Sequence, residues 1–385
     1  MPESNAAAAG RKMRIRYRGR RSQILIYLGK LLRMFLYQND WKVLPMSAMV
    51  AGLVGLVIRR RFCYYMEGTM MSALAIACVC LWNGCFNSIQ VVCRERDVIK
   101  REHRSGMHIS SYVAAHMIYQ AMLCVLQTGI ILYVFRLVGV RFPAEGLFSR
   151  FSVVDFFVSL FLIAYAADMM ALWISSLCRT TTAAMTVMPV VLIVQLVFSG
   201  GMMSLPQRME PATRAVISNY GLKVIAAQAD YNSQPLASAW NTVERMKGNE
   251  IRADVTVGQV LDWLCDPEND DAKEIRGLVV SQDGVFGQKL TVGDLADMVN
   301  ADPGNGELRA QTIHVDTTVG ELIDIIGENE IRNYVETQAT ATARESDYEH
   351  SRSRVGGYWV NLILFALLFA GLSTVTLEFI DFDRR

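Results

Sequence analysis

The chain has little of what a soluble enzyme or a nucleotide-binding protein requires. Only 19% of its 385 residues are charged, whereas 52% are hydrophobic, which is more than a soluble domain usually contains. The pattern GxxxxGK(S/T), in which backbone N–H groups and a lysine hold ATP phosphates, does not occur in the sequence. No cysteine or histidine spacing resembles a metal site. We therefore expect no catalytic residue, no metal and no cofactor in this chain.

Long apolar runs are what the sequence has instead. Six of them have about the 17 to 25 residues with which a helix crosses a bilayer: residues 42–58, 69–92, 112–135, 153–177, 183–203 and 358–377. The first run is the weakest because it is short and contains Pro45, but Trp41 precedes it as an interfacial anchor would. The runs predict an α-helical polytopic membrane protein with six transmembrane helices.

Charge indicates the topology of these spans. The segment from Arg11 to Arg21 contains seven Lys or Arg and no acid, and it leads into an amphipathic stretch rather than a secretory signal peptide. The positive-inside rule places this basic segment in the cytoplasm. Six spans then leave both termini in the cytoplasm of a multi-pass plasma-membrane protein, with residues 205–357 outside. The basic run Arg59 to Arg61 conflicts with this topology because it would lie outside.

The expected organisation has four parts: a basic tail and amphipathic helix at 1–41, five spans at 42–204, an acidic extracytoplasmic domain at 205–357, and the last span with a short tail at 358–385. Residues 205–357 hold 25 acids and 14 bases, a net charge of −11, whereas the rest holds 12 acids and 24 bases, a net of +12. An acidic outer domain is poorly suited to nucleic acid. The basic cytoplasmic face suits anionic membrane lipids or an acidic partner.

The acidic insertion contains a repeated Thr-Val-Gly motif. It occurs at residues 256–258, 291–293 and 318–320, each time before an apolar helical pattern. Thr318 and Glu321 have the spacing of a capping box, so we expect a small α/β or mostly α-helical domain. Acids recur after each motif, at Asp262, Asp297 and Asp324. Capped helices with solvated acids explain them better than a cation site does. The state of the lone insertion cysteine, Cys265, stays open between a free thiol and a disulfide.

Amide side chains recur within the expected spans. Asn83, Asn87 and Gln90 lie at helical spacing on one face of the second span, and Gln195 lies in the fifth. Such amides usually hydrogen-bond neighbouring helices. Lining of a substrate cavity is the alternative, so these residues are assigned either to helix packing or to a transport pathway.

Asp168 is an ionisable side chain inside the fourth span. A carboxyl group is costly in lipid and must face protein or water. By residue count, His116 and Gln120 of the third span lie at comparable depth, so we expect them to be its partners. We expect Asp168 to hold the inner half of the bundle together, with substrate contact as the alternative.

A charged segment separates the second and third runs. It reads ERDVIKREHRSGM from Glu95 to Met107, with six acidic or basic side chains in its first eight residues and Gly106 near its end. This pattern predicts a short helix at 94–107 that lies on the membrane face and ends at the glycine. We expect it to present Arg96, Lys100 and Arg101 to a partner.

The same segment carries a family resemblance. Its order of Glu95-Arg96, a hydrophobic pair, Arg101-Glu102 and Gly106 resembles the first intracellular loop of type-2 ABC exporter membrane domains, above all those of the G-subfamily. The amphipathic stretch before the first span looks like the connecting helix of that family. The run PVVLIVQLVFSGGMMSLPQRM from Pro189 is similar to the family's fifth span. The resemblance covers about residues 20–225 and the last span.

This resemblance implies a permease subunit of an ATP-driven exporter that works by alternating access. The helix at 94–107 would be the coupling helix, and the contacts with a separate nucleotide-binding subunit, which carries ATP and Mg, would come from Glu95, Arg96, Ile99, Arg101, Glu102 and Gly106. A second permease chain would complete a homodimer or heterodimer. The insertion at 205–357 departs from the family, whose last outer loop is short. The alternatives are a membrane scaffold or receptor and, less favoured because no filter-like loop occurs, an ion channel.

Overall fold

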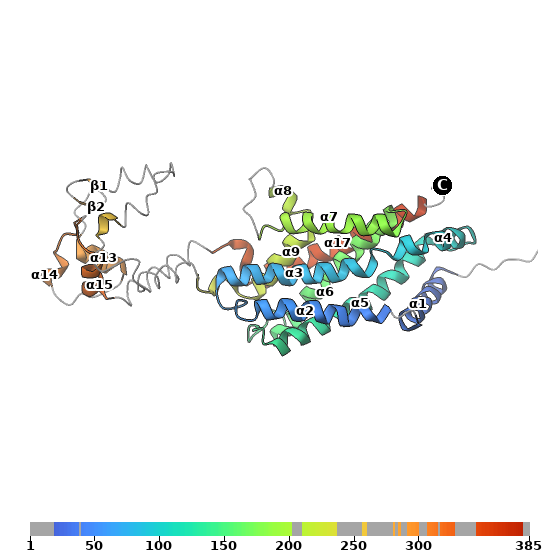
Figure 1. Cartoon of the computed structure of the whole chain (residues 1–385), viewed down its shortest axis with the longest axis horizontal. Coiled ribbons are helices and arrows are strands. Elements are labelled where there is room, and N and C mark those ends of the chain that lie inside the picture. Colours follow the sequence, from blue (N-terminus) through green and yellow to red (C-terminus); the bar gives the residue numbers. More distant parts are fainter. Residues whose placement is uncertain are drawn as a thin grey trace, which may run out of the picture. The chain divides into compact units, whose positions relative to one another are not determined.

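The computed structural model describes residues 19–37, 40–201, 210–236, 256–259, 280–281, 284–285, 291–299, 306–314, 316–327 and 344–379. The chain divides into two compact units (Figure 1). The first comprises Met1–Phe62, Met70–Ala229 and His350–Arg385, and the second comprises Cys63–Thr69 and Asp230–Glu349. Asp262, Cys265 and most of the basic tail lie outside the described residues.

The first unit is a helical bundle. Its described helices are α1 (Arg20–Tyr37), α2 (Val43–Ile58), α3 (Met66–Ser88), α4 (Val91–Arg104), α5 (Ile109–Val138), α6 (Ser152–Leu177), α7 (Thr181–Val197), α8 (Glu210–Thr213), α9 (Ile217–Gln228) and α17 (Arg352–Glu378), with the 3-10 turn η1 (Asp40–Lys42) before α2. α3 begins in the second unit and continues into the first.

The helices account for all six apolar runs. Within the described residues, four helical stretches are long and apolar enough to cross a membrane: Met66–Arg104, Ile109–Val138, Ser152–Leu177 and Arg352–Glu378. The shorter apolar helices Val43–Ile58 and Thr181–Val197 complete the set. This agrees with the expected polytopic helical membrane protein.

α6 is the central helix of the bundle. Eighteen of its 26 residues are buried, and it contacts α4, α5, α7, α9 and α17. Its approach to α3 is especially close, because a Cβ built on Gly84 would lie 2.1 Å from the carbonyl oxygen of Ala164. Small residues permit such close packing between membrane helices.

α9 is a short helix inside the first unit, with ten of its 12 residues buried. This region was expected to belong to the insertion that begins at residue 205, whereas the main segment of the second unit is Asp230–Glu349. A helix of 12 residues is too short to read as a span. Its burial therefore depends on the surrounding helices, which no local pattern describes.

The second unit contains short elements around a small apolar core. They are η3 (Tyr231–Ser233), β1 (Val280–Ser281) paired antiparallel with β2 (Gly284–Val285), α13 (Val292–Val299), α14 (Gly306–Arg309), α15 (Val319–Ile326) and η4 (Ser346–Tyr348). The core comprises Val292, Ala296, Ile313, Leu322 and Ile326. Isolated bridges join Thr256 to Thr318 and Thr291 to Thr312. The first and third motifs are therefore linked through their first residues, whereas the second pairs with a threonine outside the motifs.

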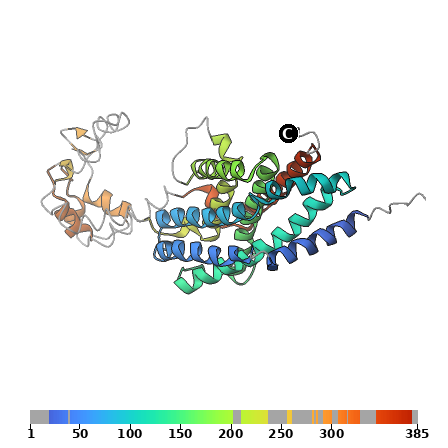
Figure 2. The ribbon, with the colours of Figure 1, turned by 45° about the vertical axis from the view of Figure 1, so that its right-hand side comes forward.

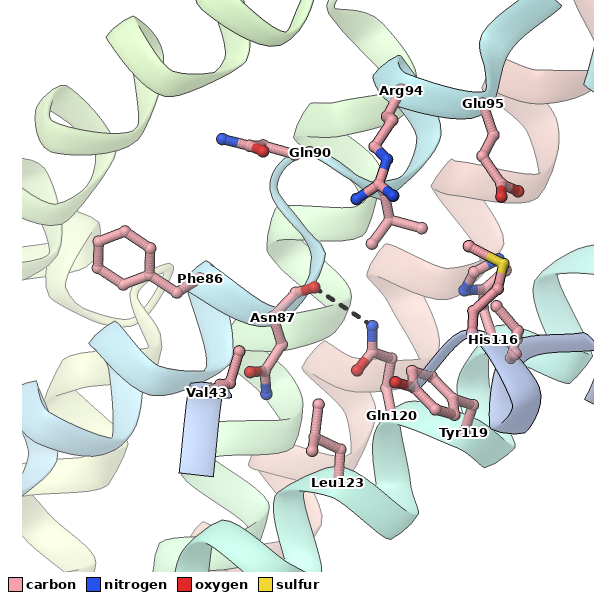
Figure 3. Close-up of a pocket in the computed structure, with 13 residues that line it drawn as sticks. Val43, Phe86, Asn87, Gln90, Arg94, Glu95, His116, Tyr119, Gln120 and Leu123 are labelled. Carbon is pink, nitrogen blue, oxygen red and sulfur yellow. Dashed lines mark hydrogen bonds between the residues drawn. The ribbon is translucent and has the colours of Figure 1, made fainter. Parts of the chain in front are cut away.

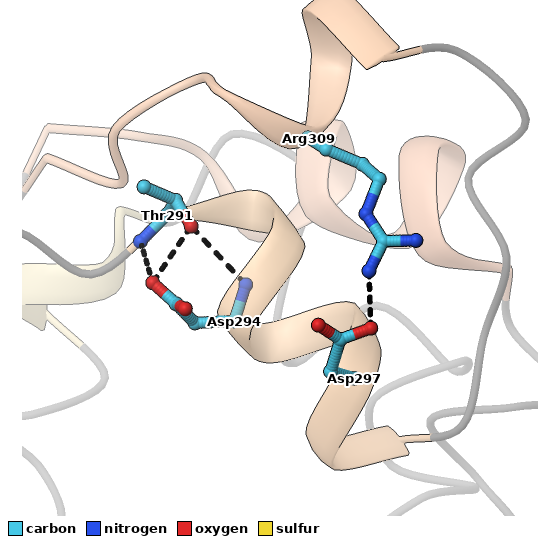
Figure 4. Close-up of polar contacts among 4 residues, drawn as sticks. All are labelled: Thr291, Asp294, Asp297 and Arg309. Carbon is cyan, nitrogen blue, oxygen red and sulfur yellow. Dashed lines mark hydrogen bonds and ion pairs between the residues drawn. The ribbon is translucent and has the colours of Figure 1, made fainter.

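The expected helix caps are present. Thr318 and Glu321 form a complete capping box, and Thr291 and Asp294 exchange equivalent hydrogen bonds (Figure 4). These bonds lower the pKa of Asp294. Asp297 pairs with Arg309, and no cluster of three metal-ligating side chains occurs among the described residues. Among the described acids, Asp294 and Glu321 thus act in helix caps and Asp297 in an ion pair.

Candidate functional site

The charged segment forms α4 as expected. The helix has no glycine or proline inside it and carries basic residues in its last turn, where they suit the negative end of the helix dipole. It ends at Gly106, whose φ of 98° lies in the left-handed region. The N–H of Met107 donates to the carbonyl of Glu102, and that of Gly106 donates to His103. These two bonds are the helix stop that glycine favours.

α4 has two different faces. Val92, Cys93 and Ile99 are buried. Four charged residues are exposed at helical spacing on the other side, and we call them the exposed charged face: Arg94, Asp97, Arg101 and Arg104. The stripe repeats at intervals of three, four and three residues, as one side of a helix does. Of the residues expected to contact a partner, Arg101 lies on this face.

The two predicted acids of α4 are held by α1. Lys30 forms a 3.3 Å ion pair with Glu95, and the Tyr27 hydroxyl donates to Glu102 at 2.6 Å. Gln23 donates to the carbonyl of Gly106 at 3.3 Å and accepts from the N–H of His108 at 3.0 Å. Burial, together with the neighbouring Glu102, raises the pKa of Tyr27. We call this set of contacts the α1–α4 clasp.

Arg96, in contrast, is held by the end of α6. Its guanidinium donates to the carbonyls of Ser176 at 3.0 Å and Cys178 at 2.9 Å. These carbonyls lie in the last turn and at the C-cap of α6, where a cation is favourable. The backbone N–H groups of Val92 and Cys93 both donate to the Ser175 hydroxyl, at 3.1 and 3.2 Å. α4 is therefore fastened to α6 as well as to α1.

Several of the residues expected to contact a partner make contacts within the chain. Glu95, Arg96 and Glu102 were all expected to face a partner subunit, but each is bound to a neighbouring helix of the same chain. Ile99 is also turned inward, being 1% exposed. The helical repeat defines two faces, but which face meets α1 and α6 follows from the tertiary packing.

A buried polar cluster joins three helices around Asp168. Asp168 on α6 accepts from Asn87 at 3.4 Å and from Ser88 on α3, and from Cys124 of α5 at 3.5 Å. Asn87 also exchanges two hydrogen bonds with Gln127, at 2.8 and 3.0 Å. These bonds bind α3, α5 and α6 together in the interior of the bundle.

The partners expected for Asp168 differ from those observed. Gln120 reaches the cluster indirectly, by donating to Ser88 at 2.9 Å and to the carbonyl of Asn87 at 3.5 Å. Neither ring nitrogen of His116 has a hydrogen-bond partner within the described part of the chain. Residue counting gave the correct helix, α5, but the true direct partner lies one turn further along, at Cys124.

The remaining predicted amides have separate positions. Asn83 is buried on α3, whereas Gln90 is exposed at the N-cap of α4, beyond the end of α3. The side-chain amide oxygen of Gln195 on α7 accepts from the backbone N–H of Ser218 at 3.0 Å. The backbone carbonyl of Gln195 accepts from the Ser218 hydroxyl. Gln195 thus caps the start of α9 and fastens it to α7.

A cavity of about 250 Å³ lies beside these contacts (Figure 3). Residues of five helices and of the α3–α4 connection line it: Leu31 and Met34 of α1, Val43 of α2, Phe86 and Asn87 of α3, Gln90 of the connection, Val91, Arg94 and Glu95 of α4, and His116, Tyr119, Gln120 and Leu123 of α5. Arg94 and Glu95 extend from α4 toward the space that Gln120 borders from α5. The cavity is therefore walled by both helices of the α1–α4 clasp.

The clasp is the feature that sequence reasoning missed. Its signal was present, because Gln23, Tyr27 and Lys30 are polar residues at helical spacing in an otherwise apolar stretch, and Glu95 and Glu102 lie two turns apart. Matching these two stripes to each other would have predicted the contact. Each stripe by itself is equally compatible with water or lipid headgroups.

Comparisons with known proteins agree with the architecture. The family model for the ABC-2 type transporter matches residues 7–218, which is more than half of the chain. Over 139 residues the chain is 27% identical to the ABC transporter ATP-binding/permease protein Rv1747 of Mycobacterium tuberculosis. That alignment covers 35% of the chain and 16% of the relative. The matched family is a membrane permease domain, and ATP hydrolysis belongs to the ABC domain rather than to this family.

Proposed function

The chain belongs to the ABC-2 type transporter family, and from that membership we propose that it is the permease subunit of an ATP-driven exporter. Its partner would be a separate nucleotide-binding subunit that supplies ATP and Mg. A second permease chain, identical or related, would complete the transport unit. The chain is a multi-pass membrane protein, and we place both termini in the cytoplasm on the charge asymmetry of its loops.

The observation that carries this proposal is the mounting of α4. One side of the helix is fastened to α1 by Tyr27 and Lys30 and to the end of α6 by Arg96. The other side presents the exposed charged face. A helix held in this way can transmit a push from a bound subunit to α1 and α6, to which these contacts connect it.

The force would pass from α4 into the bundle through α6. Arg96, Val92 and Cys93 bind the last turn of α6, and α6 contacts most of the other helices of the first unit. Seven to ten residues before these contacts on the chain, Asp168 ties α6 to α3 and α5. We propose that α3, α5 and α6 move as one body during alternating access, with the polar cluster as their internal connection.

The docking surface would be the exposed charged face rather than the whole of residues 95–106. Asp97 and Arg101 lie on it with opposite charges, so exchanging both signs reverses the pattern that a partner meets while leaving the net charge unchanged. Charge complementarity governs partner choice and association rate at such interfaces. Glu95, Arg96 and Glu102 would instead act by positioning α4.

The test is co-purification of the full chain with its native subunits, followed by an ATPase assay. We expect a stoichiometric nucleotide-binding subunit, and we expect Asp97→Lys combined with Arg101→Glu to weaken its retention at least tenfold. Arg150→Glu, an exposed arginine outside α4, is the control and should retain the partner.

Two results would contradict the proposal. If the intact, folded chain retains no ATPase, the exporter assignment fails, and the scaffold or receptor interpretation takes its place. If an ATPase is retained equally by the wild type and the charge-exchanged variant, the family assignment stands but the docking surface is wrong.

A further inference from the structure

The cavity between α1, α2, α4 and α5 lies at a level where apolar spans give way to charged helices. Val43 is the first residue of α2, Phe86 lies in the last turn of α3, and Arg94 lies in the first turns of α4. Both ribbon views place α1 and α4 at the same end of the bundle (Figures 1 and 2). We place the boundary between hydrocarbon and headgroups at this end, because apolar spans meet charged helices there.

The lining of the cavity is divided into two zones. Leu31 and Leu123 are buried at its wall, and Val43, Val91 and Met34 add further apolar surface. Arg94 and Gln90 are exposed at its edge. An occupant of matching chemistry has an apolar part and an anionic, hydrogen-bonding end.

A second observation indicates that the occupant is polar as well as apolar. His116 and Gln120 line the cavity and are each 1% exposed. Among the described residues, both ring nitrogens of His116 and the Oε1 of Gln120 lack a hydrogen-bond partner. Buried polar atoms normally find partners. Rotation of these two side chains toward the cavity would let ester or hydroxyl groups of an occupant satisfy these atoms, whereas a purely hydrocarbon occupant could not.

We propose that this cavity binds an anionic glycerophospholipid of the cytoplasmic leaflet, with its phosphate against Arg94 and the start of its acyl chains against Val43 and Phe86. A polyol headgroup, such as glycerol, supplies hydroxyl groups for His116 and Gln120. A cavity of about 250 Å³ accommodates the headgroup region and leaves the chains to extend into the bilayer. Arginine suits this role because its guanidinium matches phosphate geometry.

Such a lipid would occupy the wall that α1 and α4 share. Lys30 and Glu95 of the clasp pair beside it, so the bound lipid would fill the space between the two helices and hold α1 against the bundle. The site shares Arg94 with the exposed charged face, whereas Asp97, Arg101 and Arg104 do not line the cavity. A basic protein surface attracts anionic lipids in general, and this cavity would bind one of them at a specific site.

The experiment is native mass spectrometry of the full chain in a neutral detergent. Dioleoylphosphatidylglycerol and dioleoylphosphatidylcholine are titrated separately, and inorganic phosphate is added as a competitor. We expect the wild type to bind the anionic lipid about fivefold more tightly. Both lipids carry a phosphate, but the choline cation of phosphatidylcholine cancels its charge, so only phosphatidylglycerol keeps the net attraction of one arginine. Arg94→Gln should abolish this preference. Arg101→Gln, which removes the same charge from the same helix outside the cavity, should retain it.

A second variant tests the apolar end. Val43→Phe adds bulk to the cavity and changes no charge, so we expect it to weaken both lipids while circular dichroism stays unchanged. Equal loss of preference in Arg94→Gln and Arg101→Gln would show a diffuse basic surface and overturn the proposal. Displacement of the lipid by millimolar phosphate, or unaltered lipid binding by Val43→Phe, would overturn it too. None of these readouts depends on ATP hydrolysis, so their failure leaves the exporter proposal standing.

Discussion

Removing the carboxyl group of Asp168 should weaken the joint between α3, α5 and α6. Asp168→Leu deletes the acceptor of three hydrogen bonds, which come from Asn87, Ser88 and Cys124. Hydrogen bonds between membrane helices contribute about 0.6 kcal/mol on average and about 1.7 kcal/mol at most. We therefore expect Asp168→Leu to lower the free energy of unfolding by about 2 kcal/mol.

A double-mutant cycle isolates the hydrogen bond from the change in side-chain shape. Ser88→Ala should lower the free energy of unfolding less in the Asp168→Leu variant than in the wild type. The difference, which is the coupling energy, should be about 0.6 to 1.7 kcal/mol. Ser159→Ala is the control, because Ser159 donates to Gln228 on α9 and is not part of the cluster. Its coupling to Asp168→Leu should be close to zero.

The assay is reversible unfolding of the purified chain in mixed micelles, titrated with a denaturing detergent. Asp168→Asn is a milder change, because one amide oxygen still accepts from Ser88 while the amide nitrogen opposes the donors of Asn87 and Cys124. We expect the free energy of unfolding of Asp168→Asn to lie between those of the wild type and Asp168→Leu. A Ser88 coupling no larger than that of Ser159 would refute the cluster as a structural joint. Unchanged assembly and transport in Asp168→Asn would refute both roles assigned to this residue.

Two further predictions concern the close packing of α3 and the α1–α4 clasp. Gly84→Ala should destabilise the bundle by about 1 to 3 kcal/mol, because its Cβ would lie 2.1 Å from the carbonyl oxygen of Ala164. Gly371→Ala, at an open position, is the control in the same unfolding assay. Equal losses of unfolding free energy in the two variants would contradict the close packing. Tyr27→Phe should accelerate hydrogen exchange across α1 by removing the hydrogen bond to Glu102. Since the pKa of Tyr27 is raised, its hydroxyl should stay protonated and keep this hydrogen bond below pH of about 10, and the contact should weaken only at higher pH. Equal exchange rates in the wild type and Tyr27→Phe would contradict the clasp.

The family and the helices were accessible from sequence because their signals are local. A run of about 20 apolar residues identifies a span without knowledge of its neighbours, and all six runs are helices. The stop at Gly106 and the capping box at Thr318 were likewise readable, because each depends on residues within one helical turn.

The direction in which α4 faces was not accessible in this way. Its charges alternate around the helix, so the sequence offers several stripes that could meet a partner. Arg96 was expected to face a partner because of its place in the charged segment, and the structure adds that two carbonyls at the end of α6 bind it. Those carbonyls have no side-chain signature, since every residue carries one.

The sequence by itself determined that this chain is a helical membrane protein with a charged helix between its second and third apolar runs. Apolar length, capping residues and charge asymmetry are properties of short segments, and they survive without tertiary contacts. Only the tertiary structure decided that Asp168 meets Cys124, that α1 holds α4, and that α9 is buried. Those contacts join residues 40 or more positions apart or depend on surrounding helices. Many residues lie at similar depth in the bundle, and small differences in helix position and rotation decide which of them meet.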